Sequence, residues 1–577
     1  MCVTAAGAFA QPTSSVPCVG WPATDALNRS LPAPEEVRKP RADRFVGIFY
    51  FLWLNERGNK RAGSDAPLDV SEIFTQDPGA MNKPRSPLWG TVGRSHYWGQ
   101  PLFGYYLSTD PWVIRRHAHM LADAGIDTLI FDATNALTYR EQYMQLCKVY
   151  AEIRKAGNRT PQFAFMVNSD AGKTAEQLYK DLYQPGLYTE LWFQWEGKPL
   201  MICDPAAASP EVKAFFTLRA AHWPFTLVNT QNAWHWETTY PQVYGYTSDP
   251  KKPEQVNVSV AQNLRARDGK VTNMSNFDAR GRSFHDGKTD TSPGAVNFGH
   301  NFQEQWERAM ELDPPFVMVT GWNEWIAGRW GDPNGRPVFV DQFTEEYSRD
   351  IEPMVGGHGD NYYYQLVSNV RRFKGAAPIA SASGPITINI DGSFDQWRDV
   401  APEFLDHRDD TLPRDFDGAG SLHYTNRTGR NDFVECKVAR DDAKLYFYAR
   451  TAHPITARTD ANWMWLLIDA DQNPATGWEG YDYVINRTMD ADGSSWLEKN
   501  TGGWNWTKVA KVKYQVAGNE IQIAVPRSSL PLLAHAAPLS LDFKWADNLQ
   551  HPGDIMDFYQ SGDVAPDGRF MYRYFAK

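Results

Sequence analysis

Cysteine and long apolar runs are scarce in this chain. Its 577 residues include 5 cysteines, and none of them forms a C-x-x-C pair, so the sequence offers no zinc site built on thiolates. No run of about 18 apolar residues occurs, so we expect no transmembrane helix. The spacings H-E-x-x-H and G-x-S-x-G and the P-loop pattern are also absent. The sequence therefore does not indicate a transition-metal catalytic site.

Positive charge is in deficit. The chain has 58 Lys and Arg against 69 Asp and Glu, which gives a net charge of −11, and it has no basic stripe with interleaved aromatic residues. Because nucleic-acid phosphates require a basic surface, we expect no nucleic-acid partner. Aromatic residues are abundant instead, at 14% of the chain. This richness is common in carbohydrate-active proteins, although large cores also consume aromatic side chains.

The first 40 residues have the character of a leader or wrapping segment. They are rich in Pro, Ser and Ala, and Ala8-Phe9-Ala10 resembles the small-x-small cleavage site of a secretory signal. A basic start and a full apolar stretch are missing. We expect the protein to be exported, either secreted or placed in the periplasm or at the cell surface.

The length implies two or three domains. Between residues 41 and 374, apolar strand-like runs alternate with helical spacings, which predicts a parallel sheet with both faces covered. About eight such units suit a (β/α)8, TIM-like barrel, although a doubly wound open sheet would alternate in the same way. The expected strands are 45–53, 127–132, 162–167, 200–203, 225–229, 256–260 and 316–320. The expected helices are 111–124, with Asp110 as its cap and Pro111 in its first turn, 139–155 and 302–312.

The pattern changes after residue 374. Residues 375–385 are small residues and prolines without an apolar period, which is typical of a linker. Residues 386–577 contain short apolar or alternating runs between turn signals, which predicts an antiparallel β-sandwich. The expected fold class is therefore α/β plus all-β, with no indication of the oligomeric state.

The most informative segment is Phe316-Val-Met-Val-Thr-Gly-Trp-Asn-Glu-Trp325. A buried strand ends there in Trp322, Asn323, Glu324 and Trp325. The carboxylate can move a proton or stabilise a cationic sugar, and indoles offer flat apolar faces to sugar rings. The alternative is a strand that ends in a structural Asn-Glu pair. We predict Glu324 as catalytic, and Asn323, Trp322 and Trp325 as substrate-binding.

Polar residues also follow the other expected strands. In a barrel the carboxyl ends of the strands share one mouth, so these side chains are expected to converge there. Asp132 is a predicted catalytic residue, with capping of the following turn as the alternative role. Asn135 and Asn168 are predicted to bind substrate. The remaining strand-end residues are Asp170, Asp204, Asn229, Gln231 and Gln262.

Two segments resemble the glycoside hydrolase family 99/71-like barrels, which include endo-α-mannosidases and α-1,3-glucanases. One runs from Gly104-Tyr-Tyr to Ala124-Gly-Ile-Asp127, and the other is Thr320-Gly-Trp-Asn-Glu-Trp325, followed by Tyr347-Ser-Arg-Asp-Ile-Glu-Pro353. The resemblance implies a barrel and a sugar-cleaving site, and it adds Tyr106 as a predicted substrate-binding residue.

The sequence departs from the family pattern at one position. The family 99-like motif reads N-E-W-x-E, and here Glu324 matches its first acid while Ala327 stands at the second. A second carboxylate must then come from elsewhere. Asp132 is the first choice, and Glu237 in the aromatic loop Ala233-Trp-His-Trp-Glu237 is the second. Trp236 of that loop is predicted to bind substrate.

The carboxyl-terminal region resembles carbohydrate-binding module family 9-like β-sandwiches. The matching segments are 388–397, 467–482 and 562–570. Asp469, Asp471, Asn473 and Asp482 crowd oxygen ligands into one loop, as a structural Ca²⁺ requires. An Asx-rich turn without an ion is the alternative. We expect catalysis to need no cofactor.

Together these features predict a glycoside hydrolase that acts on a poly- or oligosaccharide through carboxylate acid/base chemistry at the barrel mouth. Ala327 keeps open a second hypothesis, a non-catalytic glycan-binding protein with a degenerate barrel. A lyase on the same scaffold is the third, because fold alone does not select the reaction.

Overall fold

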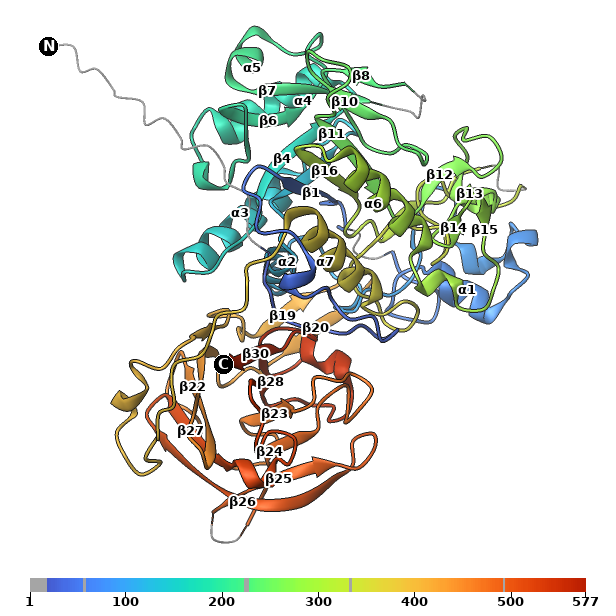
Figure 1. The fold of residues 1–577 in the computed structure, drawn as a ribbon. Helices are drawn as coiled ribbons and strands as arrows, with labels where there is room; N and C mark the ends of the chain where they lie inside the picture. The colour runs from blue at the N-terminus through green and yellow to red at the C-terminus, as the bar shows by residue number, and fades with distance from the viewer. Residues whose placement is uncertain (1–17, 56–58, 223–227, 332–334, 491–492) are drawn as a thin grey trace, which may run out of the picture.

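The computed structural model describes residues 18–55, 59–222, 228–331, 335–490 and 493–577. Two large sheets organise the chain, one in the blue-to-green part of Figure 1 and one in the orange-to-red part. The signal-like Ala8-Phe9-Ala10 lies outside the described residues. Within them, no helix has the length and apolarity that a bilayer span requires.

Parallel strands form the first sheet's main ring. Pairing runs in the order β11-β16-β1-β3-β4-β6-β7-β9, and each neighbouring pair is parallel. The strands are β1 (Phe45–Tyr50), β3 (Thr128–Ala133), β4 (Gln162–Val167), β6 (Lys198–Ile202), β7 (Thr217–His222), β9 (Ala233–His235), β11 (Gln255–Ser259) and β16 (Phe316–Thr320).

The two ends of this sheet meet. β8 (Thr230–Gln231) pairs with β10 (Tyr244–Tyr246) at one end of the sheet. β9 follows β8 in the chain after a single residue, and it pairs with β7 at the other end. The side-chain amide of Gln255 on β11 accepts from the His235 backbone N–H at 2.8 Å and donates to its carbonyl at 2.9 Å. This amide takes the place of a peptide group in the ladder. The result is a nearly closed, TIM-like barrel rather than an open doubly wound sheet.

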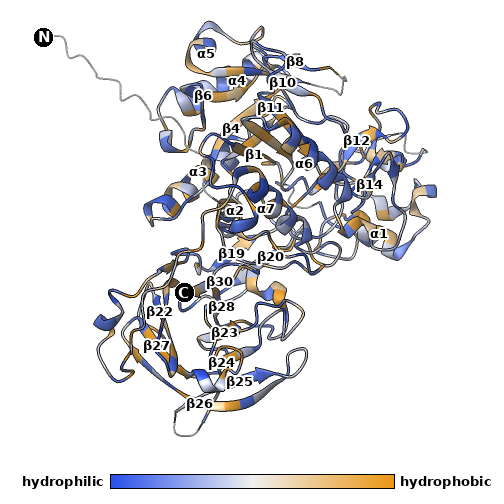
Figure 2. Cartoon of the chain, in the orientation of Figure 1, coloured by the Kyte–Doolittle hydropathy of each residue, from blue (hydrophilic) through white to orange (hydrophobic). Residues whose placement is uncertain are grey.

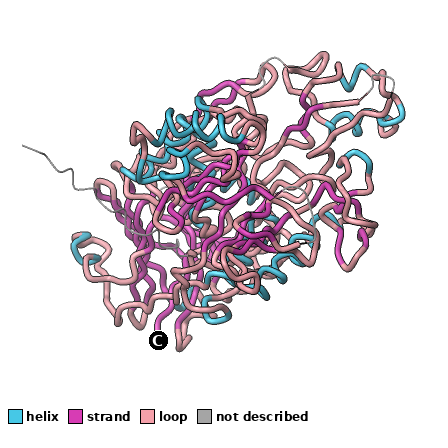
Figure 3. Tube along the Cα trace, turned by 90° about the horizontal axis from the view of Figure 1, so that it is seen from above, coloured by secondary structure: helices cyan, strands magenta, loops and turns pink. Residues whose placement is uncertain are grey.

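Helices cover the outside of the barrel over much of its circumference (Figure 3). Asp110 caps the first of them by accepting from the Trp112 N–H at 3.0 Å, and Pro111 fills its first position, as the sequence predicts. In the described residues, no helix follows β7 or β9, so the expected alternation breaks there. The covering helices are α2 (Pro111–Asp123), α3 (Arg140–Lys155), α4 (Ala171–Leu178), α5 (Pro210–Phe215), α6 (His300–Leu312) and α7 (Asn361–Lys374).

One barrel strand was not predicted from the sequence. The predicted strand 225–229 begins in residues that the structure does not describe, and Val228 and Asn229 are not in a strand. The barrel strand is β7, some residues earlier, and its sequence contains Arg219. That charge hides the apolar pattern, but the guanidinium is buried and pairs with Glu254 at 2.6 Å. A buried charge is tolerated only when it is paired, as it is here.

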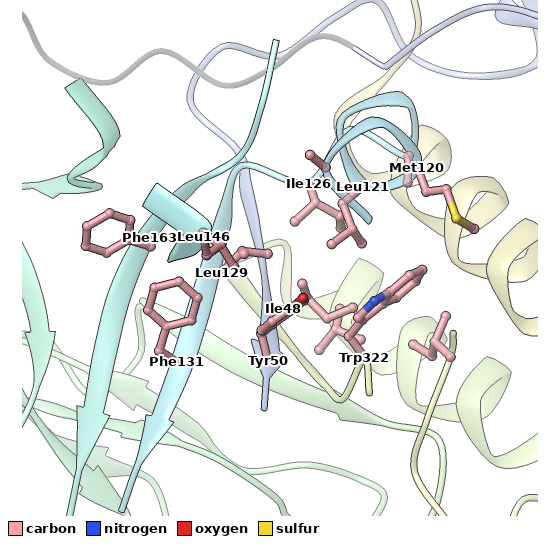
Figure 4. Close-up of a cluster of buried hydrophobic side chains, with 14 of the residues drawn as sticks. Ile48, Tyr50, Met120, Leu121, Ile126, Leu129, Phe131, Leu146, Phe163 and Trp322 are labelled. Carbon is pink, nitrogen blue, oxygen red and sulfur yellow. The ribbon is translucent and has the colours of Figure 1, made fainter. Parts of the chain in front are cut away.

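The barrel strands alternate between two hydrophobic layers, as the pleat of a strand dictates. Phe49 on β1 and Phe51 directly after it belong to the cluster inside the barrel, while Ile48 and Tyr50 on β1 belong to the cluster under the helices. Orange, apolar segments accordingly gather on the central strands in Figure 2. Figure 4 shows the outer layer, in which Trp322 lies with Ile48 and Tyr50 of β1.

The second sheet is antiparallel and folds over on itself. Strand β26 (Trp506–Ala517) pairs through its first half with β25 and through its second half with β27, so it belongs to both halves. One continuous, barrel-like sheet results, not clearly the two separate sheets of the expected sandwich. Its other strands are β18 (Phe404–Leu405), β21 (Phe433–Arg440), β22 (Lys444–Thr451), β23 (Trp465–Asp469), β24 (Tyr483–Met489), β25 (Ser495–Asn500), β27 (Glu520–Pro526), β28 (Leu539–Asp547), β29 (Asp563–Ala565) and β30 (Tyr572–Ala576).

The second sheet's loops pack against the barrel. The hairpin of β19 (Arg414–Asp417) and β20 (His423–Asn426) lies on the loop before α2. Arg414 Nε lies 2.8 Å from Asp110 Oδ2, the helix-capping carboxylate, and both side chains are buried. The guanidinium also covers the ring of Trp112 at 5.2 Å. The ion pair between Arg414 and Asp110 therefore joins the two parts of the chain at the N-terminus of α2.

Candidate active site

A cavity of about 260 Å³ opens where the barrel strands end. Predicted site residues from four different strand ends meet in it: Asp132 at the end of β3 and Asn135 after it, Asn168 after β4, Trp236 after β9 and Glu324 after β16. Convergence at the carboxyl ends is what the barrel geometry predicts. The cavity is completed by Phe49, Phe51, Trp53, Thr134, Ser169, Asn263, Asp341 and Arg349.

Glu324 is held from both its backbone and its side chain. Its N–H donates to Asp350 Oδ1, and the preceding Trp322 N–H donates to the Phe49 carbonyl at 2.9 Å. Its carboxyl Oε2 accepts from Gln342 Nε2 at 2.7 Å and from Arg349 Nη2 at 2.9 Å. The strand-end turn therefore presents the Glu324 carboxyl to the cavity in one orientation.

Arg349 is the centre of the site's charge. Its guanidinium lies 2.9 Å from Glu324 Oε2, 3.3 Å from Glu237 Oε2 and 3.9 Å from Asp341 Oδ1. It also covers the Trp236 ring at 4.7 Å, and it is buried. These three carboxyl groups raise the pKa of Arg349 despite its burial, so the guanidinium stays charged.

A single cation cannot neutralise these three carboxylates, so protons are retained in the cluster. Burial raises the pKa of Glu324 well above its ordinary value, and the nearby Asp341 and Asp350 raise it further. Burial likewise raises the pKa of Glu237 to about 7. Carboxyl groups that keep a proton near neutral pH can act as general acids.

Asp341 was not among the predicted residues. It lies in the loop between β17 (Ile326–Gly328) and α7, not directly after a barrel strand, so strand-end reasoning has no signal for it. Its side chain lines the cavity, and 42% of the side-chain surface is exposed to solvent. Burial raises the pKa of its carboxyl, and Arg349 opposes that shift. Gln342 and Arg349 lie in the same loop and were missed for the same reason. Asn263, on β12 (Gln262–Arg265), is the residue after Gln262, which strand-end reasoning named in its place.

The Glu324 and Asp341 carboxyl groups are close neighbours. Both approach the same Arg349 Nη2, so Glu324 Oε2 and Asp341 Oδ1 are within about 6.8 Å of each other. Paired carboxyls of glycoside hydrolases are about 5–5.5 Å apart in retaining enzymes and about 6.5–9.5 Å apart in inverting ones. The separation in this cavity is compatible with such a pair.

Asp132 is placed for both of the roles that the sequence left open, the cap of a turn and a carboxyl group at the barrel mouth. Its Oδ1 accepts from the Thr134 N–H at 2.9 Å, which caps the turn after β3. The same side chain lines the cavity, where burial raises the pKa of the carboxyl and Asp341 adds repulsion. Asp132 is therefore a turn cap whose carboxyl group also belongs to the acidic wall.

Glu237 lies behind the cavity wall. It is fully buried, its Oε1 accepts from the Asn263 N–H at 2.9 Å, and its Oε2 faces Arg349. It is not among the residues that line the cavity. From this position it orients Arg349 and Asn263, and the catalytic role that the sequence suggested stays a prediction.

Four residues that were predicted to bind substrate are buried and do not line the cavity. Trp322 is fully buried and packs edge-on against His117 at 5.4 Å, and Trp325 stacks on Trp98 at 4.5 Å. An indole enclosed in this way presents no face to a sugar. Asn323 brackets the Phe51 peptide with its amide at 2.9 and 3.2 Å. The fourth residue, Tyr106, donates to a buried carboxylate, Glu352 Oε2, at 2.7 Å.

Ala327 faces a different environment. It lies on β17, which pairs with β2 (Ser95–Tyr97), and it packs in a hydrophobic cluster that includes Trp89 and Phe339. It is buried and does not line the cavity. The residue at the second acid position of the family-like motif therefore belongs to a satellite core.

The other strand-end residues outside the cavity lining are Asp170, Asp204, Asn229, Gln231 and Gln262.

The predicted calcium loop has a self-sufficient hydrogen-bond pattern. Asp469 Oδ1 accepts from the Gln472 N–H at 2.6 Å, Asp471 Oδ1 from the Asn473 N–H at 3.0 Å and Asp482 Oδ2 from the Ala470 N–H at 2.9 Å. Carboxyl oxygens of the three aspartates approach one another within 4.8 Å. Asn473 itself is exposed and caps a turn. The loop combines an Asx-rich turn with clustered oxygens, so both sequence interpretations remain.

Comparison with known proteins finds similarity to solved structures. Two structures of the GH99 endo-α-mannosidase from Bacteroides thetaiotaomicron, one in complex with bis-tris-propane, each cover 57% of this chain and 97% of their own at 13% identity. Their TM-scores are 0.32 and 0.33. No family model and no curated protein matches the sequence. The function is therefore argued from the side chains of the cavity.

Proposed function

We propose that this protein is a glycoside hydrolase whose acid/base pair is Glu324 and Asp341. The observation that carries the proposal is the presence of these two carboxyl groups in one cavity, within about 6.8 Å of each other and joined through Arg349. Hydrolysis of a glycosidic bond requires one carboxyl group that donates a proton and a second that acts on the opposite side of the scissile bond.

The two groups differ in the way the chemistry requires. Glu324 is almost fully buried, and its raised pKa keeps the proton that the leaving-group oxygen must receive. Asp341 is more open to solvent, so a water molecule or a sugar carbon can approach it, and Arg349 opposes the rise of its pKa. Arg349 holds the charge balance, because it stabilises the Glu324 carboxylate that forms after proton donation.

The remaining walls suit a carbohydrate. Trp53 and Trp236 supply aromatic faces, and Asn135 and Asn168 are exposed amides that can exchange hydrogen bonds with sugar hydroxyls. The indole Nε1 of Trp53 is buried without a hydrogen-bond partner among the described residues. A buried donor of this kind is satisfied when a ligand oxygen accepts from it. The lining thus combines four aromatic side chains with nine polar or charged ones, which offers a sugar both stacking faces and hydrogen-bond partners.

The test is a cleavage assay on a panel of α- and β-linked glycans, with new reducing ends as the readout. Glu324→Gln and Asp341→Asn should each lower the rate by about 10²–10⁴-fold, as expected for loss of a general acid or its partner. Asp170→Asn is the matched control, because this exposed carboxylate also follows a barrel strand but does not line the cavity.

The outcomes separate the three hypotheses. Cleavage by the wild type that survives in Asp170→Asn and is lost in both cavity variants supports the proposal. Glycan binding without any cleavage supports the non-catalytic protein that Ala327 suggested. Cleavage that produces unsaturated, ultraviolet-absorbing ends identifies a lyase. Full activity in Glu324→Gln refutes the acid/base assignment.

A further inference from the structure

A second acidic cluster lies outside the cavity, where the second sheet's loops meet the barrel. Asp410 is in the loop after β18, Asp432 precedes β21 and Asp563 begins β29. One carboxyl oxygen from each lies within 4.8 Å of the other two. All three residues are buried, at 1%, 4% and 2% exposure. Segments distant in the sequence therefore bring three carboxyl groups to one buried point.

The oxygens in this cluster are unpartnered. Both oxygens of Asp410, Oδ1 of Asp432 and Oδ1 of Asp563 have no hydrogen-bond partner among the described residues. The other oxygen of Asp432 accepts from the Asp409 N–H at 2.9 Å, and that of Asp563 accepts from the Phe433 N–H at 2.6 Å. Backbone hydrogen bonds thus orient two of the carboxyl groups and leave one oxygen of each free.

Protein cations do not balance this charge. Arg116 on α2 lies 3.8 Å from Asp410 Oδ2, but it also lies 3.7 Å from Asp567 Oδ1. Asp406 adds another carboxyl group, both of whose oxygens are unpartnered. Of the other cations near the cluster, Lys544 donates to the Pro566 carbonyl, and His407 lies 3.2 Å from Asp123 Oδ2. Burial and mutual repulsion raise the pKa of Asp410 and of Asp563 well above the ordinary range.

We propose that Asp410, Asp432 and Asp563 bind a divalent cation of the Ca²⁺ type. Calcium takes oxygen ligands at about 2.3–2.6 Å, so two ligands on opposite sides of the ion are about 4.8 Å apart. The three oxygens lie within 4.8 Å of one another, close enough for all three to contact one such ion. The donor set is carboxylate only, which suits a hard cation better than zinc or copper.

This site differs from the loop that the sequence suggested. In the loop of Asp469, Asp471 and Asp482, each aspartate has an oxygen that accepts a backbone hydrogen bond within the turn, and none has a buried unpartnered oxygen among the described residues. The cluster of Asp410 has several. Its contact with Arg116 of the barrel also places the cation between the two parts of the chain, so binding should stabilise the whole protein.

The test uses the full-length protein, stripped with a chelator and dialysed. Calcium binding is measured by calorimetry, and thermal unfolding is followed with added Ca²⁺, with added Mg²⁺ and with chelator. We expect Ca²⁺ to raise the Tm of the wild type. Asp410→Asn should weaken Ca²⁺ binding at this site by about tenfold or more. The part of the Ca²⁺-induced rise in Tm that comes from this site should then be lost. Asp471→Asn, in the other acidic loop, is the matched control and should retain that share.

The chelator condition keeps the test decisive if variants differ in stability. Without the cation, Asp410→Asn removes a buried, repelled charge, so it should unfold at a temperature equal to or above that of the wild type. With Ca²⁺ the order should reverse. A wild type that binds no Ca²⁺, or a Ca²⁺ response that is unchanged in Asp410→Asn and lost in Asp471→Asn, overturns the proposal.

Discussion

Substitution of Glu237 by Gln tests the charge balance around Arg349. In the unfolded chain a Glu loses its proton near pH 4.5, whereas burial raises the pKa of Glu237 to about 7 in the folded protein. Because the folded pKa is the higher one, the unfolded state is increasingly favoured as the pH rises from 4.5 to 7. Each pKa unit corresponds to about 1.4 kcal/mol, so above pH 7 this carboxyl group costs about 3 kcal/mol of stability.

The amide in Glu237→Gln has no charge to desolvate, and its oxygen can still accept from the Asn263 N–H. Arg349 retains Glu324 and Asp341 as partners. We therefore expect the variant to be as stable as the wild type, or slightly less stable, at pH 5. At pH 8 it should be more stable by up to about 3 kcal/mol. It should also retain cleavage, because Glu237 does not line the cavity.

The measurement is urea unfolding of both proteins at pH 5 and pH 8, with equal slopes required for the comparison. Glu211→Gln, an exposed residue on α5, is the control and should show no difference between the two pH values. If Glu237→Gln is instead destabilised more at pH 8 than at pH 5, Glu237 is the ionised partner of Arg349 in the folded protein. The assignment of its proton would then be wrong.

Three further predictions address the motif, the interface and the cavity wall. Ala327→Glu should not raise activity and should lower the free energy of unfolding by more than about 3 kcal/mol, because it buries an unpaired charge beside Trp89; urea unfolding and the glycan assay check both. Arg414→Ala should cost about 3–5 kcal/mol by urea unfolding, because it leaves Asp110 buried and unpaired, whereas the exposed Arg427→Ala on the same hairpin should change little. Trp53→Ala should raise KM about tenfold and leave kcat nearly unchanged, because stacking acts on substrate and transition state alike.

Local features were predictable where one segment contains the whole signal. The cap of Asp110 and the apolar spacing of 111–124 predicted α2, and the apolar run of 316–320 predicted β16. β7 was not predicted because Arg219 interrupts its apolar pattern. Its charge is paired with Glu254, a residue far along the chain that the local pattern does not reveal. The expected sandwich is a single folded sheet because β26 is long enough to pair on both sides.

The acidic residues of the cavity also divide into those that a local pattern predicted and one that it did not. Polar residues directly after strands pointed to Asp132 and Glu324 because parallel strands end on one side of the sheet. Asp341 and Arg349 come from a loop that returns to the cavity after β17, and no local pattern marks such a return. The indoles of Trp322 and Trp325 have the same chemistry whether they face a sugar or the core, so composition could not assign them.

The sequence alone therefore determined helix α2, strand β16, the parallel character of the first sheet and the strand end at which Glu324 lies, because hydrophobic period and chain order are properties of neighbouring residues. Only the tertiary structure decided which carboxyl groups share Arg349, which aromatic rings are enclosed and which aspartates meet beside α2. Those relations depend on distances between segments that lie far apart along the chain, and burial and pKa follow from such distances.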